Sequence, residues 1–127
     1  MQSTSPRTTF TGIDAAYYRV KDLARARAFY VDVVGLTPAL EVPGVVCEFT
    51  FPGGETFGLF QDPEGSFIEG HGVMLGVSDI KAAVADLMSR GVKFDDDGKI
   101  EESPICWMAF ARDTEGNKFI VHQHKTA

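Results

Sequence analysis

The sequence contains few cysteines, no long apolar run and no excess of basic residues. Its two cysteines, Cys47 and Cys106, lie in apolar, strand-like runs without another Cys or a His at metal-ligand spacing, so we expect buried, reduced thiols rather than a disulfide. No apolar run approaches the length of a membrane-spanning helix. The formal net charge of −6, from 18 acidic and 12 basic residues, repels phosphate backbones. We therefore expect a soluble, cytoplasmic protein whose partners include neither nucleic acid nor a membrane.

The length of 127 residues is enough for one compact domain with a hydrophobic core. Residues 1–10 are rich in Ser, Thr and Pro and contain no apolar run. This composition is typical of a flexible N-terminal arm rather than a signal peptide. We expect the single domain to span residues 11–124.

Two stretches of the sequence, residues 18–27 and 75–84, repeat the same unit. In each, a β-rich run ends in Val, one polar residue follows, and an Asp stands at the N-cap position of a helix. An amphipathic helix follows each Asp and stops at a glycine, which suits a left-handed C-terminal position. The matching residues are Val20 and Val77, Asp22 and Asp79, and Gly35 and Gly91. The shared order of cap, apolar stripe and glycine stop predicts an internal duplication.

Each half of the duplication is predicted to read β-α-β-β-β, with module one at about residues 11–62 and module two at about residues 70–124. Strands are expected between Pro, Gly and Asp turns, at residues 37–42, 45–51, 56–61, 92–95, 105–112 and 118–124. Residues 113–117 form a predicted hairpin turn, and the acidic residues 95–97 are expected in a solvated turn. Each module is expected to form an antiparallel sheet with a helix on one face, so that two modules enclose a shared cleft.

Three short motifs accompany the duplication: Val20-Lys-Asp-Leu23, Phe29-Tyr30 followed by Val34-Gly35-Leu36, and Asp113-Thr-Glu-Gly-Asn117. Together with the repeated unit they resemble the vicinal oxygen chelate superfamily of glyoxalases, bleomycin-resistance proteins and extradiol dioxygenases, over about residues 11–124. The resemblance implies an α+β fold in which two tandem β-α-β-β-β modules form an open, cup-shaped antiparallel sheet with helices outside. It also implies a small-molecule site inside the cup and a homodimer. Because members include metal enzymes and metal-free drug-binding proteins, the fold alone does not assign the chemistry.

The resemblance further implies where a metal would bind, because metal enzymes of this superfamily place one ligand, mostly His or Glu, on each of four strands. The matching positions in this sequence are Ala15, Gly58, Gly72 and Ile120. None can bind a metal, whereas an enzyme site needs three or four N, O or S ligands, so we expect no metal or other cofactor. His71 lies next to Gly72, but a register shift that turned it inward would also turn the bulky residues of that strand into the cup. We therefore expect His71 to be an exposed or hydrogen-bonded histidine at the strand end.

The same four positions indicate which residues face into the cup, because side chains alternate along a strand. Inward positions are smaller and more mixed than outward ones, which is typical of a cavity. The expected ligand-binding residues are Tyr17, Arg19, Phe60, Met74, Met108, Phe110, Ile120 and His122. Arg19 is expected to meet an acidic partner such as Glu48, or an anionic or carbonyl-bearing ligand. The opposite phase of residues 105–112 would turn Trp107 inward in place of Met108, as a stacking platform for a planar ligand.

The function predicted first is a metal-free small-molecule binding protein that sequesters an apolar or aromatic ligand in the cup. The alternative is a glyoxalase-like or dioxygenase-like lyase, isomerase or oxidoreductase. Such an enzyme would use a metal on non-standard ligands, or metal-independent acid-base chemistry with His122 and Tyr17 as candidate catalytic groups. No nucleophile is visible beside His122. A third possibility is an accessory or regulatory domain in which the aromatics and methionines of the cup only fill a core.

Overall fold

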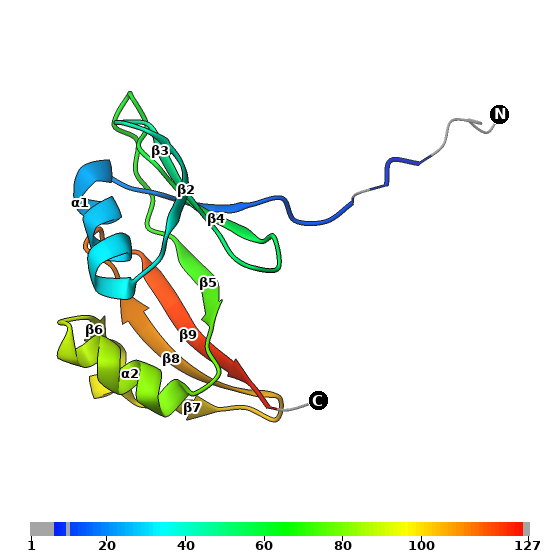
Figure 1. Ribbon diagram of the computed structural model, residues 1–127, viewed down its shortest axis with the longest axis vertical. Helices are drawn as coiled ribbons and strands as arrows, with labels where there is room; N and C mark the ends of the chain where they lie inside the picture. Colours follow the sequence, from blue (N-terminus) through cyan, green and yellow to red (C-terminus); the bar gives the residue numbers. More distant parts are fainter. Residues whose placement is uncertain (1–6, 10, 126–127) are drawn as a thin grey trace.

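Two modules of strands and helices follow each other in the computed structural model, which describes residues 7–9 and 11–125. The first contains β1 (Ala16–Arg19), α1 (Leu23–Ala28), the π-helical segment η1 (Phe29–Val34), β2 (Pro38–Val42), β3 (Val46–Thr50) and β4 (Thr56–Phe60). The second contains β5 (His71–Gly76), α2 (Ile80–Ser89), β6 (Lys93–Phe94), the 3₁₀-helical segment η2 (Asp95–Gly98), β7 (Glu101–Glu102), β8 (Cys106–Arg112) and β9 (Lys118–His124). Both helices lie on one side of the molecule (Figure 1). The predicted fold class, an α+β fold of two modules with open sheets and outer helices, is confirmed.

The predicted N-terminal arm is described only in part. Residues 1–6 and 10 lie outside the described residues, and residues 7–9 are exposed and belong to no helix or strand. Among the residues that the structure describes, no helix has the length and apolar character needed to cross a membrane.

Each helix begins at the predicted aspartate. The Asp22 side chain accepts a hydrogen bond from the Arg25 amide at 3.1 Å, and Asp79 accepts one from the Ala82 amide at 3.2 Å. A glutamine adds a second cap in each module, because it accepts a hydrogen bond from the first helical amide. The two glutamines and their donors are Gln61 with Leu23 (2.7 Å) and Gln123 with Ile80 (2.8 Å). These two caps satisfy amides that a helix leaves without an intrahelical partner.

The first helix does not continue as a regular α-helix up to its glycine stop. From Phe29 onward it widens into η1, which ends at Gly35 in the left-handed region with φ 94°. The Gly35 and Leu36 amides both donate to the Tyr30 carbonyl, at 3.0 and 2.9 Å. The aromatic rings of Phe29 and Tyr30 are buried, with their centroids 5.1 Å apart.

The strands form two sheets, in the order β1-β4-β3-β2 and β5-β9-β8-β6, with β7 beside β8. β1 is parallel to β4 and β5 is parallel to β9, whereas the remaining pairs are antiparallel. The sheets are therefore mixed, which corrects the expectation of wholly antiparallel pairing. In each module, the helix connects the first strand to a strand that runs in the same direction. Two chain reversals follow, so the last strand of the module again runs parallel to the first. β7 is a second difference, because Glu101–Glu102 lie outside the strand ranges predicted from the sequence.

The core lies between the sheets and the helices. Alternation places Tyr18 of β1 and Val20, which follows that strand, on the helix-facing side together with Phe119 and Val121 of β9, and all four are buried. An aromatic cluster continues across both modules, because the Tyr30 ring centroid lies 5.3 Å from that of Phe57 and 5.9 Å from that of Phe119. Aromatic pairs at these distances contribute about 0.5–1.5 kcal/mol each beyond their area of burial. The helix-facing side of both sheets is thus largely filled by this core.

The hairpin turn at residues 113–117 docks against the first module. The Asn117 side chain is fully buried; it donates to the Arg19 carbonyl at 3.1 Å and accepts from the Gly70 amide at 2.7 Å. The buried Asp113 carboxylate accepts from the Tyr30 hydroxyl at 2.7 Å. Burial and the charge of Asp113 raise the pKa of Tyr30 far above its usual value, so this hydroxyl stays protonated. The predicted hairpin is therefore also a polar connection between the modules.

Candidate functional site

The first sheet presents a tyrosine laid flat on a glycine. Tyr17 on β1 lies opposite Gly58 on β4, and Glu48 on β3 lies opposite Gly58 from the other side. A Cβ atom at Gly58 would lie only 2.6 Å from atoms of the Tyr17 ring, so this position must be a glycine for the ring to rest there. The Tyr17 hydroxyl donates to the Glu48 carboxylate. With 43% of the side chain exposed, Tyr17 offers an anchored aromatic surface on the side away from the helix.

Arg19 shares that surface with Phe60, its partner across β1 and β4. Its guanidinium hydrogen-bonds to the Ser66 hydroxyl and not to Glu48, so the acidic partner considered from the sequence is wrong. The ion pairs among the described residues do not include Arg19. The Arg19 charge therefore lies beside an apolar surface with a neutral partner.

The second sheet presents a matching apolar surface. Met74 on β5 lies opposite Ile120 on β9, which lies opposite Phe110 on β8. In the next row, Met108 lies opposite His122. Trp107 lies opposite Gln123 and packs against the core. The register therefore puts Met108, and not Trp107, on the surface away from α2. We refer to the two surfaces that lie away from the helices as the concave faces.

The two candidate acid-base residues lie on different sheets. His122 is buried on β9, and its ring packs edge-on against His124 with centroids 4.7 Å apart. Tyr17 lies on β1 with its hydroxyl bound to Glu48. No described contact joins Tyr17 to His122, and the interactions described for His122 include no nucleophile. The geometry does not assemble an acid-base pair within one chain.

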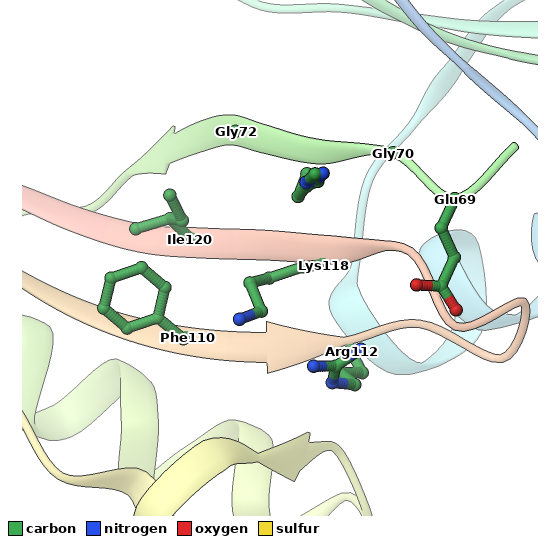
Figure 2. Close-up of a pocket in the computed structure, with 8 residues that line it drawn as sticks. Glu69, Gly70, Gly72, Phe110, Arg112, Lys118 and Ile120 are labelled. Atoms are coloured by element: carbon green, nitrogen blue, oxygen red, sulfur yellow. The ribbon is translucent and has the colours of Figure 1, made fainter.

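The concave face of the second sheet contains a hollow of about 390 Å³ (Figure 2). Its floor is Phe110 and Ile120, its basic side chains are His71, Arg112 and Lys118, and its rim includes Glu69 and two glycines. In the figure, Lys118 extends between the apolar residues and Arg112. We call this cavity the β9 hollow.

The position of His71 corrects the reasoning from strand alternation. His71 pairs with Lys118, but Val73 already pairs with Phe119, so Gly72 is an extra residue in β5. This β-bulge, with Gly72 at φ 120°, places His71 on the concave face while the bulky side chains after it still face the core. His71 is exposed at the strand end as expected, yet it also lines the β9 hollow.

A second, larger cavity follows the seam between the two sheets. Its volume is about 630 Å³, and its lining includes Ile13 and Phe57 from the first module and Met74 from β5. Ile13 is 88% exposed and Met74 is 51% exposed. Of the expected ligand contacts, Met74 therefore borders this open apolar groove, whereas Tyr17 and Arg19 of β1 do not line it.

The residues at the four family ligand positions do not suit a metal. Ala15 lies ahead of β1, the Tyr17 ring covers Gly58, Gly72 forms the bulge, and Ile120 is buried in the floor of the β9 hollow. Within residues 7–9 and 11–125, no three His, Cys, Asp or Glu side chains gather as metal ligands. The donor set that a catalytic cation needs is therefore not provided by these positions.

The acidic residues 95–97 form part of η2 rather than a simple loop. Asp95 forms ion pairs with Lys118 at 3.2 Å and Arg112 at 3.4 Å. The hydrogen bond from Lys118 lowers the pKa of Asp95, so its carboxylate is charged at neutral pH. Asp95 thus holds the two cations of the β9 hollow from one side.

Sequence reasoning missed the basic side chains of the β9 hollow. Lys118 has the same strand parity as Ile120 and His122, and Arg112 pairs directly with Lys118 across the hairpin. This shared strand parity is the sequence feature that could have identified Lys118 and its partner Arg112 as residues of the concave face. The contribution of His71 depends on a bulge that alternation does not reveal.

A comparison with known protein families gives the classification. The model described as Glyoxalase/Bleomycin resistance protein/Dioxygenase superfamily matches residues 12–121. The chain belongs to this superfamily. Among curated proteins, none matches the sequence significantly.

Solved structures share the fold over nearly the whole chain. An antibiotic-binding protein, TnmS3 from Streptomyces sp. CB03234, has 24% sequence identity and a TM-score of 0.78, covering 94% of this chain and 100% of that one. A superfamily member from Sphaerobacter thermophilus DSM 20745 has 24% identity and a TM-score of 0.75, with 90% and 98% covered. Lactoylglutathione lyase from Agrobacterium tumefaciens has 24% identity and a TM-score of 0.69, with 91% and 96% covered. Their similarity establishes the shared fold.

Proposed function

We propose that this chain is a metal-free small-molecule binding protein that sequesters an apolar or aromatic ligand on its concave faces. The observation that carries the proposal is the chemistry of the four ligand positions, which are alanine, two glycines and isoleucine. These residues leave room and apolar contact where a catalytic cation would need imidazoles or carboxylates. The expected ligand contacts are the eight residues predicted from the sequence: Tyr17, Arg19, Phe60, Met74, Met108, Phe110, Ile120 and His122.

The arrangement of aromatic side chains supports a flat ligand. Tyr17 is held in place by Gly58 and Glu48, and Phe110 lies in the floor of the β9 hollow. Aromatic rings bind planar ligands through large apolar contact and offset stacking. TnmS3, which shares the fold, is an antibiotic-binding protein, and this supports such a ligand for this chain.

We also propose that two copies form a homodimer in which their concave faces share the ligand. Tyr17 is 43% exposed, Leu40 50% and Met74 51% in the single chain, and all three lie on these faces. A second copy would cover them and enclose the groove. Two reduced, buried cysteines agree with the cytoplasmic location that we propose for it.

A thermal-shift screen of the metal-free protein tests the proposed function. Aromatic antibiotics, thiol adducts and catechols are the probes, and a ligand that binds the folded state raises the melting temperature by mass action. Met108→Ala should reduce the shift, whereas Met88→Ala, on the exposed face of α2, should leave it unchanged. Failure of every probe class to stabilise the protein would count against ligand sequestration.

Metal analysis of the purified protein tests the metal-free part of the proposal. We expect no stoichiometric zinc, nickel, manganese or iron, and no effect of a chelator on ligand binding. A stoichiometric metal that is lost together with activity on chelation would establish the enzyme alternative instead. A metal-free protein that converts a bound substrate would establish acid-base catalysis.

A further inference from the structure

The β9 hollow differs from the rest of the concave faces because it combines an apolar floor with a surplus of hydrogen-bond donors. Phe110 and Ile120 supply the floor, whereas Arg112 and Lys118 supply permanent positive charge. The Lys118 ammonium lies 5.5 Å from the centroid of the Phe110 ring. Charge and apolar contact are therefore available to one small ligand at the same time.

Asp95 uses only part of the donor capacity of these cations. Its carboxylate accepts a hydrogen bond from the Nε–H of Arg112 at 3.4 Å and forms an ion pair with the Lys118 ammonium at 3.2 Å. No hydrogen bond to another described residue occupies the Nη1 and Nη2 groups of Arg112. Two cations share one carboxylate that does not line the hollow, so the trio keeps one positive charge. Unused guanidinium and ammonium donors beside an apolar surface are well suited to an oxyanion.

The acidic residue of the lining lies at one end of the β9 hollow. The Glu69 Oε2 atom lies 2.9 Å from where a Cβ of Gly116 would be, which places this carboxylate against the turn that joins β8 and β9. Figure 2 shows Glu69 at that turn and Phe110 and Ile120 at the opposite end, with Lys118 between them. An anion next to the aromatic floor would therefore meet Lys118 before it met Glu69.

We propose that the β9 hollow binds the acidic group of an aromatic ligand. The ring lies against Phe110 and Ile120, and a carboxylate or phenolate oxygen accepts hydrogen bonds from Lys118 and Arg112. His71 contributes a further polar group at the strand end. The inference rests on the proposed small-molecule function and specifies its ligand class as arenes with an acidic substituent.

Two probes of the same shape separate charge from apolar contact. β-Naphthoate carries a carboxylate, and β-naphthamide replaces it with a neutral amide of similar size. We expect naphthoate to bind at least about tenfold more tightly than naphthamide in an NMR titration, with amide shifts concentrated at residues 71, 112 and 118. Lys118→Met should remove this preference, and Lys118→Arg should restore it. Lys99→Met, a charge-matched control at an exposed lysine, should retain it.

A second variant is expected to raise naphthoate affinity, so misfolding cannot explain its effect. Asp95→Asn removes the carboxylate that competes for both cations, so naphthoate affinity should rise by about threefold to tenfold. Equal affinity of the two probes, or unchanged naphthoate affinity in both Lys118→Met and Asp95→Asn, would overturn the inference. If both probes bind the concave faces with equal affinity, this inference is wrong but the proposed small-molecule function is still supported. Binding of neither probe would also overturn the inference, while the thermal-shift screen decides the proposed function separately.

Discussion

At the scale of single residues, the most constrained polar group is the Asn117 side chain. Its amide is fully buried and links three parts of the chain, through the Arg19 carbonyl, the Gly70 amide and the Asp113 carboxylate. No aliphatic side chain can replace both its donor and its acceptor. A buried backbone group left without a partner costs about 1–3 kcal/mol. The asparagine of the 113–117 turn therefore has a structural role that is independent of any ligand.

Asn117→Ala should lower the free energy of unfolding by about 2–4 kcal/mol, because it leaves the Arg19 carbonyl and the Gly70 amide unpaired. Urea denaturation followed by circular dichroism measures this change. Thr114→Ser, at an exposed position of the same turn, keeps the hydroxyl that donates to Glu115 and should change stability by less than about 0.5 kcal/mol. A loss below about 1 kcal/mol for Asn117→Ala would show that water or a rearranged turn replaces the amide.

At the scale of elements, the start of α1 depends on a carboxylate from the far end of the chain. Glu115 accepts hydrogen bonds from the Lys21 and Asp22 amides at 2.8 and 3.1 Å and pairs with Arg25 at 2.7 Å. Burial raises the pKa of Glu115, but the hydrogen bonds from Arg25 and the two amides outweigh burial and leave its pKa lowered. The ionised form is thus favoured by the folded state.

Stability should therefore depend on Glu115 ionisation. A lowered folded-state pKa gives stability that is complete above the unfolded-state pKa of about 4.3 and is lost as the pH falls through the folded-state value. Glu115→Gln should destabilise the protein at pH 7 by about 1–3 kcal/mol and by less near pH 3. Chemical denaturation of both proteins across that range measures the difference.

Glu64→Gln is the control for the Glu115 experiment. Its side chain is exposed and forms no hydrogen bond or ion pair with the described residues. It should follow the wild-type stability curve at every pH. A Glu115→Gln variant whose destabilisation stayed constant from pH 7 to pH 3 would contradict a role for its charge.

The helix caps and the strand alternation were predictable from sequence because both are local. Asp22 and Asp79 cap the helices as predicted, and the alternation of β9 places Phe119 in the core. The contact of Glu115 with α1 was not predictable, because it joins residues about ninety positions apart. The bulge at Gly72 was also hidden, since one extra residue changes the facing of His71 without changing the apolar pattern that follows.

At the scale of the whole molecule, one chain fills the core on the helix side and leaves the concave faces open. The cluster around Tyr30 joins both modules on the helix side. On the other side, Leu40 and Met74 are about half exposed. Apolar side chains gathered on one surface indicate a binding or assembly surface. A ligand alone can cover the β9 hollow. We propose that a second copy covers Leu40 and Met74, which are exposed on the concave faces of the two different sheets.

Two methionines test this assembly. Met74 is 51% exposed on the concave face and Met88 is 42% exposed on α2, so the same substitution can be compared on the two sides. Burying the exposed half of a methionine contributes about 1 kcal/mol, and a two-fold dimer buries it twice. Met74→Lys should therefore raise the dimer dissociation constant at least about tenfold in analytical ultracentrifugation. Met88→Lys should leave it unchanged. A wild-type protein that stays monomeric at high micromolar concentration would contradict the dimer, and each concave face would then have to bind its ligand within one chain.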